Sequence, residues 1–255
     1  MLNDDKLKKI LPPEKIKALK IFIQEHIVNN NVVGIMLTGS HVHGDAGKHA
    51  DLDIFILLNV SDSRTRGNVF INDIEIEYFI NPIIQIEKYY EQEYNKQTNH
   101  TAHMFANCIV LYETNDELKR LIELGKEFLG KELPEPSDYG LYNIRYQLDD
   151  HRKDLLDAFE TRDKMTFELV SGAILKDIIV YFGQIKKFYP AKAKRLIKQL
   201  ELIDYDFSRK LQLFLTSENT LKKRCELLID CISYIESMIG GPRPDSFSFT
   251  SPLSL

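Results

Sequence analysis

The 255-residue sequence predicts an α+β fold, in which a domain of strands and helices precedes a domain made only of helices. Three observations lead to this prediction. Short β-rich runs alternate with helical patterns as far as about Glu113, and almost all of the later sequence follows amphipathic helical patterns. Between the two halves, the segment 131–140 is interrupted by proline and glycine, as is typical of a linker. We therefore expect domains at residues 1–133 and 134–255.

The composition narrows the class of protein. An apolar content of 44% is enough for a sizeable core, and a net charge of −5 without a basic stripe disfavours a nucleic-acid binder. The three cysteines form no metal-binding pattern and indicate free thiols in a reducing compartment. The first residues lack an apolar signal core, and no run reaches the roughly 18 apolar residues that a membrane span requires. We expect a cytoplasmic protein without membrane contact.

The elements of the first domain follow from residue periodicity. Apolar residues at helical spacing predict a helix over 14–30, and further helices over 83–96 and 116–129. Buried strands are predicted at 32–38, where a Gly-Ser turn follows, at 52–60 and at 108–113. The run 52–60 is almost continuously apolar, which indicates cover on both faces of a sheet. The run 71–80 alternates polar and apolar residues, as a half-buried strand does.

The second domain is predicted to be a bundle of four or five helices. Gly240-Gly241-Pro242 ends the last helix, and two phenylalanines in the irregular tail that follows indicate that the tail packs against another part of the protein. The expected helices span residues 141–160, 162–187, 191–202, 206–217 and 219–239.

Two aspartates at the start of a core strand carry the clearest chemical signal. Side chains in a strand alternate with a period of two, so Asp51 and Asp53 project to the same side. Two ionised carboxylates so close together repel each other unless a cation compensates their charge. Mg²⁺ is bound by such carboxylates together with substrate phosphates, and a pair of ions can hold both the attacking and the leaving oxygen of a phosphoryl transfer.

The neighbouring residues extend this pattern. Gly39 and Ser40 follow a strand and open a short helix, a position that suits the phosphates of a nucleotide. A third carboxylate is expected from the next acidic strand, where Glu75 and Glu77 lie on one face and either can ligate an ion or accept a proton. Taken singly, these features are common in solvated turns and strands, but their combination and spacing indicate a functional site.

Two stretches make this pattern specific. "GSHVHGDAGKHADLDIFI" and "DIEIEYFINP" resemble the signature of the DNA polymerase beta-like nucleotidyltransferase superfamily, over residues 30–82. Glu75, between Ile74 and Ile76, fits the position of the third acidic residue, and Glu77 fits it almost as well. The order of the two domains is similar to that of bacterial aminoglycoside nucleotidyltransferases of the streptomycin and kanamycin types.

The resemblance implies a fold, a reaction and a set of site residues. It implies a mixed sheet with helices, ATP as donor, two Mg²⁺ ions, and transfer of AMP to a hydroxyl group with release of pyrophosphate. The acceptor is then a small molecule such as an aminoglycoside-like antibiotic. Asp51, Asp53 and Glu75 become the catalytic and metal-binding residues, and Gly39 and Ser40 the residues that bind the phosphates.

Further binding residues are expected in or near the second domain. Asp150 and Asp154 share one face of a helix and, with Glu77, can bind a cationic acceptor, whereas Lys187 and Lys194 can reach the nucleotide phosphates. A solvated helix surface is the competing interpretation of both charged stretches.

Two other functions are compatible with the same sequence. The chain can instead adenylylate a protein, as antitoxin-like relatives do, or serve as a non-catalytic nucleotide-binding regulatory module. The long helical half favours a built-in acceptor site, and the retained acidic residues favour catalysis. Polymerisation of nucleic acid is disfavoured by the acidic balance. The expected state is a monomer or a homodimer.

Overall fold

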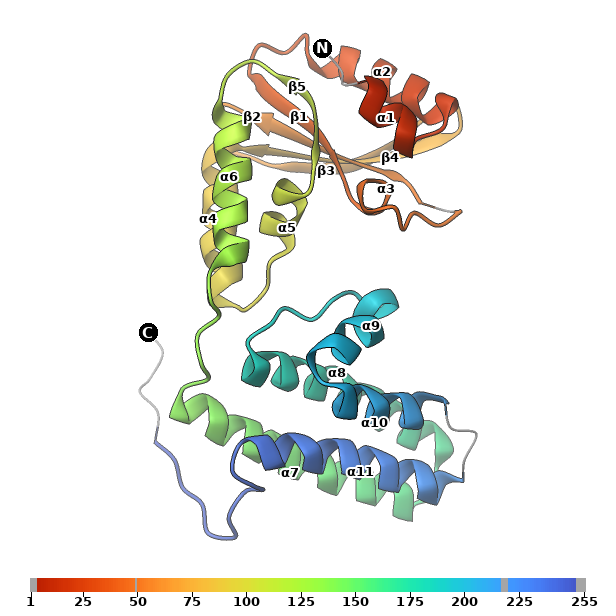
Figure 1. The fold of residues 1–255 in the computed structure, drawn as a ribbon, viewed down its shortest axis with the longest axis vertical. Helices are drawn as coiled ribbons and strands as arrows, with labels where there is room; N and C mark the ends of the chain where they lie inside the picture. The colour runs from red at the N-terminus through yellow and green to blue at the C-terminus, as the bar shows by residue number, and fades with distance from the viewer. Residues whose placement is uncertain (1–3, 49, 217–219, 251–255) are drawn as a thin grey trace. The chain divides into compact units, whose positions relative to one another are not determined.

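A computed structural model describes residues 4–48, 50–216 and 220–250. The chain divides into two compact units, Met1–Lys131 and Glu132–Leu255. Figure 1 shows a sheet flanked by helices in the first unit and helices alone in the second. The mixed sheet and the helical second unit confirm the predicted α+β fold.

The first unit contains one sheet and six of the helices in the described part of the chain. Its elements are α1 (Asp4–Ile10), α2 (Pro13–His26), β1 (Val32–Thr38), α3 (Ser40–His43), β2 (Leu52–Leu58), β3 (Thr65–Ile71), β4 (Ile74–Pro82), α4 (Ile83–Asn95), α5 (His100–Ala106), β5 (Ile109–Glu113) and α6 (Glu117–Gly130).

The five strands lie in the order β3-β4-β2-β1-β5. Only the pair β2 and β4 is parallel, and the other three neighbouring pairs are antiparallel. The register places Asp53 of β2 beside Thr38 of β1 on one side and beside Glu77 of β4 on the other. The end of β1, the start of β2 and the middle of β4 therefore meet at one place in the sheet.

Both faces of the sheet are covered, as the continuous apolar run of β2 predicts. Alternate residues of β2, including Ile54, pack with Leu19 and Phe22 of α2 on one face. On the other face, Phe55 and its neighbours pack with the helices α4, α5 and α6. These two layers of apolar side chains fix the sheet, and with it the start of β2.

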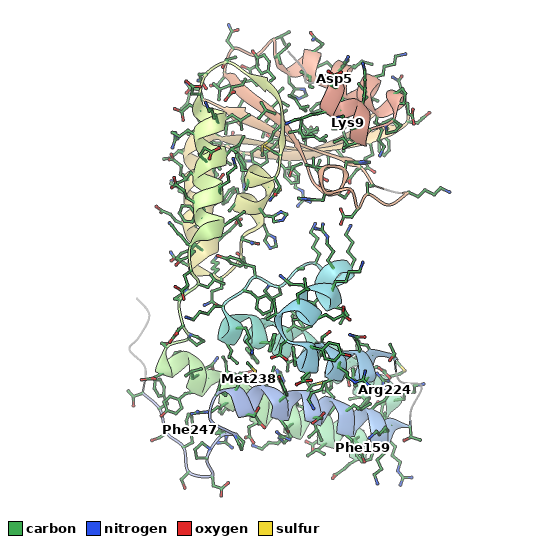
Figure 2. The ribbon with its side chains drawn as sticks, viewed as in Figure 1. Asp5, Lys9, Phe159, Arg224, Met238 and Phe247 are labelled. Carbon is green, nitrogen blue, oxygen red and sulfur yellow. The ribbon has the colours of Figure 1, made fainter. Side chains whose placement is uncertain are left out.

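Among the residues that the structure describes, all secondary-structure elements of the second unit are helices. They are α7 (Asp138–Glu160), α8 (Lys164–Lys186), α9 (Ala193–Ile203), α10 (Tyr205–Thr216) and α11 (Leu221–Met238). Their core is apolar and includes stacked rings of Phe182 and Phe207, whose centroids lie 4.0 Å apart. Arg224 of α11, labelled in Figure 2, pairs with Glu168 and lies over the ring of Phe214. The five predicted helices are confirmed to within a few residues, except that residues 217 and 219 fall outside the described ranges.

The described part of the tail after α11, up to residue 250, packs on the helical unit. Its two phenylalanines predicted packing but not the partner, and residues 251–255 of the predicted tail lie outside the described ranges. The ring of Phe247, labelled in Figure 2, lies 5.3 Å from that of Tyr142 of α7, and Phe249 lies 4.9 Å from Tyr139. These contacts tie the tail to the first turns of α7.

Three short elements were not anticipated from the sequence. They are α1, α5 and β3, and β3 has the most consequence for the site. Its Gly67 and Asn68 have low strand propensity, so the sequence favours only the second strand of this hairpin. Asn72 and Asp73, included in the predicted strand 71–80, form the turn, with positive φ angles of 50° and 62°.

The three cysteines are free, as expected. Burial raises the pKa of the Cys108 and Cys231 thiols to about 12, so neither forms a nucleophilic thiolate at neutral pH. None of the helices described is both long enough and apolar enough to cross a membrane.

Asp204 joins two helices of the second unit. It follows α9 directly, and its carboxylate accepts hydrogen bonds from the Phe207 N–H at 3.1 Å and the Tyr234 hydroxyl at 2.8 Å, with Lys186 Nζ 3.1 Å away. Burial alone pushes the pKa of this carboxyl upward, but the three donors outweigh burial and lower the pKa below its usual value.

We therefore predict that Asp204→Ala lowers the free energy of unfolding at pH 7 by about 1–2 kcal/mol, because α10 loses its N-terminal cap. The folded-state pKa lies below the unfolded-state value, so the ionised carboxylate stabilises the fold above about pH 4 and loses this effect as the pH falls further. Thermal unfolding between pH 7 and pH 3 tests this. A difference from wild type that does not narrow at low pH contradicts it.

Candidate functional site

Three carboxylates meet at one end of the sheet. Asp51, Asp53 and Glu77 are each half-buried, and one carboxylate oxygen from each lies within 4.8 Å of the others. Asp51 immediately precedes β2, and the strand period places it on the same side as Asp53. The parallel register then places Glu77 beside Asp53. We refer to these three residues as the acidic cluster.

The acidic cluster has the chemistry of a site for a hard divalent cation. Two ionised carboxylates at this separation repel each other by on the order of 3 kcal/mol at an effective dielectric constant of about 20. A divalent cation between them converts this repulsion into attraction. An all-oxygen set of carboxylates suits Mg²⁺ and does not favour zinc, which prefers nitrogen and sulfur. The cluster therefore fits the ion expected from the sequence.

Gly39 allows the aspartate to occupy its position. It links β1 to α3 with a φ angle of +78°, and a Cβ atom at this residue would lie only 1.8 Å from Asp53 Oδ2. Any other side chain therefore displaces the carboxylate as well as straining the backbone. Ser40, predicted to bind phosphate, begins α3 directly after this contact. Because α3 has four residues, any phosphate contact here relies on local N–H groups and the serine hydroxyl.

The third carboxylate of the cluster is Glu77, whereas the sequence analysis assigned Glu75. Glu75 lies on the same face of β4, but its Oε1 accepts a hydrogen bond of 3.0 Å from Asn68 of β3. The difference arises because the register between β2 and β4 brings Asp53 opposite Glu77. The sequence left both glutamates as candidates for the third carboxylate and favoured Glu75, with Glu77 also a candidate for binding the acceptor; the geometry favours Glu77.

Lys15 is a polar residue at the site that sequence reasoning missed. Its Nζ donates to the carbonyl of Ala50 at 2.6 Å and lies 2.8 Å from Nε2 of the buried His41. Lys15 thus ties α2 to α3 and to the residue before Asp51. A signal was present in the sequence, because Lys15 shares its helix face with Leu19 and Phe22, both of which are core residues.

Burial explains the electrostatics of this contact. Burial lowers the pKa of Lys15, although the nearby Asp51 carboxylate opposes this shift. Burial, and then the charge of Lys15, lower the pKa of His41. A neutral His41 can accept the Lys15 proton donor at Nε2, so both residues complete the contact without two facing cations.

The remaining predicted site residues lie in the helical unit. Lys187, in a left-handed conformation after α8, pairs with Glu135 at 2.8 Å and Glu132 at 3.0 Å, and both raise its pKa. It lines a cavity of about 320 Å³ within this unit, beside Ile185 and Ile239.

Asp150 is half-buried and Asp154 exposed on α7, and the structure records no ionic partner for either among the residues it describes. Lys194 lies in the first turn of α9. The binding roles assigned to these residues, and to Lys187, stay predictions.

Comparison with known proteins agrees with the geometry of the first unit. Residues 15–104 match the model of the nucleotidyltransferase domain family, a range that includes Lys15, Gly39 and the whole acidic cluster. The match supports membership of this unit in the nucleotidyltransferase superfamily, and with it nucleotide transfer in general. No curated protein matches the chain.

A solved structure has a similar fold. The crystal structure of a nucleotidyltransferase-like protein from Exiguobacterium sibiricum matches with a TM-score of 0.52 and 15% sequence identity, over 86% of this chain and 73% of that chain. At this identity the likeness concerns the fold alone.

Gly39 provides a first test of the site. We predict that Gly39→Ala weakens Mn²⁺ binding at least about tenfold, because the added methyl group displaces Asp53 from the cluster. Gly44→Ala is a matched control, since Gly44 also has a positive φ angle, +73°, but nothing lies within 4 Å of its Cβ position. Titration of Mn²⁺ by electron paramagnetic resonance measures both variants. Equal affinities in the two variants contradict the role of the Gly39 contact.

Lys15 provides a second test. Lys15→Met removes the ammonium group that donates to the Ala50 carbonyl and contacts His41, and we expect it to lower the free energy of unfolding by about 1–3 kcal/mol at pH 7. Lys17→Met, at an exposed position of the same helix, controls for the change of charge and should change it by less than about 0.5 kcal/mol. Urea unfolding measures both. Equal effects of the two substitutions argue against a special role for Lys15.

Proposed function

We propose that the chain is an adenylyltransferase that uses ATP and Mg²⁺ and transfers AMP to a hydroxyl group of a small molecule. The observation that carries this proposal is the acidic cluster of Asp51, Asp53 and Glu77, held against Gly39 at one end of the sheet. The family match over residues 15–104 supports nucleotide transfer in general. What is proposed beyond this is the use of ATP as the nucleotide donor, of Mg²⁺ as the metal and of a small molecule as the acceptor.

The proposed reaction is an in-line displacement at phosphorus. The acceptor oxygen forms a bond to the α-phosphorus of ATP while the bond from that phosphorus to the bridging oxygen breaks, and pyrophosphate leaves. The hydroxyl proton passes to a carboxylate, for which Glu77 and Glu75 are the candidates on β4. When bound, Mg²⁺ would neutralise negative charge on the attacking and leaving oxygens.

The chain's own residues have distinct tasks in this proposal. Asp51 and Asp53 hold the metal ions, and Glu77 completes the site. Gly39 and Ser40 let the triphosphate approach the backbone closely. Lys15 contributes by fixing the residue that precedes Asp51, and is therefore a positioning residue.

The acceptor is proposed to be a polyhydroxylated small molecule that carries amino groups, as an aminoglycoside does. Support comes from the two-domain resemblance and from the carboxylates Asp150 and Asp154 on one face of α7, which suit cationic amines. Lys187 and Lys194 are proposed as contacts to nucleotide phosphates. For Lys187 this requires exchange of its present partners Glu135 and Glu132.

The first test is pyrophosphate release from ATP and Mg²⁺ in the presence of a panel of aminoglycosides, spectinomycin and lincosamides. We expect release that depends on one acceptor and falls at least about a thousandfold in the Asp51→Asn, Asp53→Asn double variant, because metal binding is lost. If no compound of the panel causes pyrophosphate release although ATP and Mn²⁺ still bind, the proposed acceptor class is contradicted. Release unaffected in the double variant contradicts the proposed site.

A second test separates the two glutamates. Glu77→Gln should abolish both Mn²⁺ binding and transfer, whereas Glu75→Gln should leave Mn²⁺ binding intact, because only Glu77 belongs to the acidic cluster. If Glu75 accepts the proton, Glu75→Gln also lowers the rate and removes the acidic limb of the pH–rate profile. Loss of Mn²⁺ binding in Glu75→Gln, with retention in Glu77→Gln, contradicts the assignment.

A further inference from the structure

An arginine on the edge strand β3 contacts the acidic cluster. The Nε and Nη2 atoms of Arg66 both donate to Oε1 of Glu77, at 3.0 and 2.7 Å. The guanidinium also lies over the ring of Phe79, 5.0 Å from its centroid. The register places Arg66 opposite Phe79, so the side chain reaches diagonally along β4 to Glu77. Arg66 is thus held at two points beside the cluster.

This contact changes the charge of the site. The acidic cluster with all three carboxylates ionised carries three negative charges, and the guanidinium, which keeps its proton in proteins, offsets one of them. The Arg66 side chain is 71% exposed, so the ion pair contributes little to the stability of the fold. Arg66 can still affect the binding of a metal ion, because the ion and the guanidinium would both contact the Glu77 carboxylate.

The sign of this effect differs for the two species that the site can meet. A free divalent cation is repelled by the guanidinium and competes with it for Glu77. A metal–triphosphate complex is an anion, because the charge of the triphosphate exceeds that of the metal, and it is attracted by the same guanidinium. One fixed positive charge therefore opposes the first species and favours the second.

We propose that Arg66 is a specificity-determining residue that makes the site prefer a metal–nucleotide complex to a free divalent cation. The proposal rests on the proposed function, since it assumes that Asp51, Asp53 and Glu77 bind metal. It goes further by giving a role to a residue outside the acidic cluster and to the strand that carries it.

The chain offers matched variants for the test. Arg66→Gln removes the charge, and Arg66→Lys keeps the charge but loses the paired N–H donors. Arg64→Gln removes the same charge two residues earlier, at a side chain that bonds to the Tyr89 hydroxyl and makes no recorded contact with the cluster. For each variant, Mn²⁺ is titrated alone by electron paramagnetic resonance, and then together with a non-hydrolysable ATP analogue by calorimetry.

Opposite shifts are expected in the two titrations. In Arg66→Gln, free Mn²⁺ should bind about three- to tenfold more tightly and the Mn²⁺–nucleotide complex about three- to tenfold more weakly. Both shifts should diminish at high salt, Arg66→Lys should stay close to wild type, and Arg64→Gln should match wild type in both titrations.

Two results would overturn the proposal, and they differ in what else they affect. If Arg66→Gln leaves both affinities unchanged, or weakens both together, Arg66 is a surface ion pair or a geometric support, while the proposed function stands. If wild-type protein binds no Mn²⁺ with or without nucleotide, both the role of Arg66 and the proposed function fail.

Discussion

The parallel pairing of β2 with β4 determines where the acidic cluster forms. Because Asp53 lies opposite Glu77 in this register, a carboxylate from each strand comes to the same point, and the strand period adds Asp51. A shift by one residue would turn either side chain to the opposite face. The apolar layers on both faces, formed with α2 and with α4, α5 and α6, hold this register, so the geometry of the site depends on the core.

The residues around the cluster each address a cost of bringing three carboxylates together. Gly39 removes the side chain that would occupy the space of the Asp53 carboxylate, and Lys15 anchors the backbone just before Asp51. Arg66, which lies on β3, offsets part of the negative charge of the acidic cluster. In the proposed function, a bound divalent cation neutralises the remaining negative charge of the cluster, and a nucleotide completes the site. Relief of the repulsion between the carboxylates then contributes to the free energy of binding.

Local patterns predicted a large part of this arrangement. The alternation of a strand places Asp51 and Asp53 on one side, and the Gly-Ser turn follows from the sequence after β1. Between Glu75 and Glu77 the sequence favoured Glu75, whereas the structure brings Glu77 to Asp53, because the pairing depends on the register between two strands that the local sequence does not encode. The contact of Lys15 with Ala50 was missed for the same reason, since 35 residues separate the two in the chain.

The hairpin of β3 and β4 also depends on strand pairing that the local sequence does not encode. A strand containing Gly67 and Asn68 has little local preference for its conformation, and it forms because β4 offers an edge for pairing. Arg66, which this strand carries to Glu77, was therefore not recognisable from the sequence as a neighbour of the site. The fold class, by contrast, depends on long periodic segments and was predicted correctly.

In the proposed function, these three carboxylates bind the metal of a nucleotidyl transfer. The most direct test is anomalous diffraction from crystals grown with Mn²⁺ and a non-hydrolysable ATP analogue. We predict Mn²⁺ within coordination distance of Asp51, Asp53 and Glu77, about 2.0–2.3 Å, with the triphosphate reaching it from the side of Gly39 and Ser40. An ion bound by Glu75 without Glu77, or a nucleotide bound with no metal at this cluster, would contradict the account.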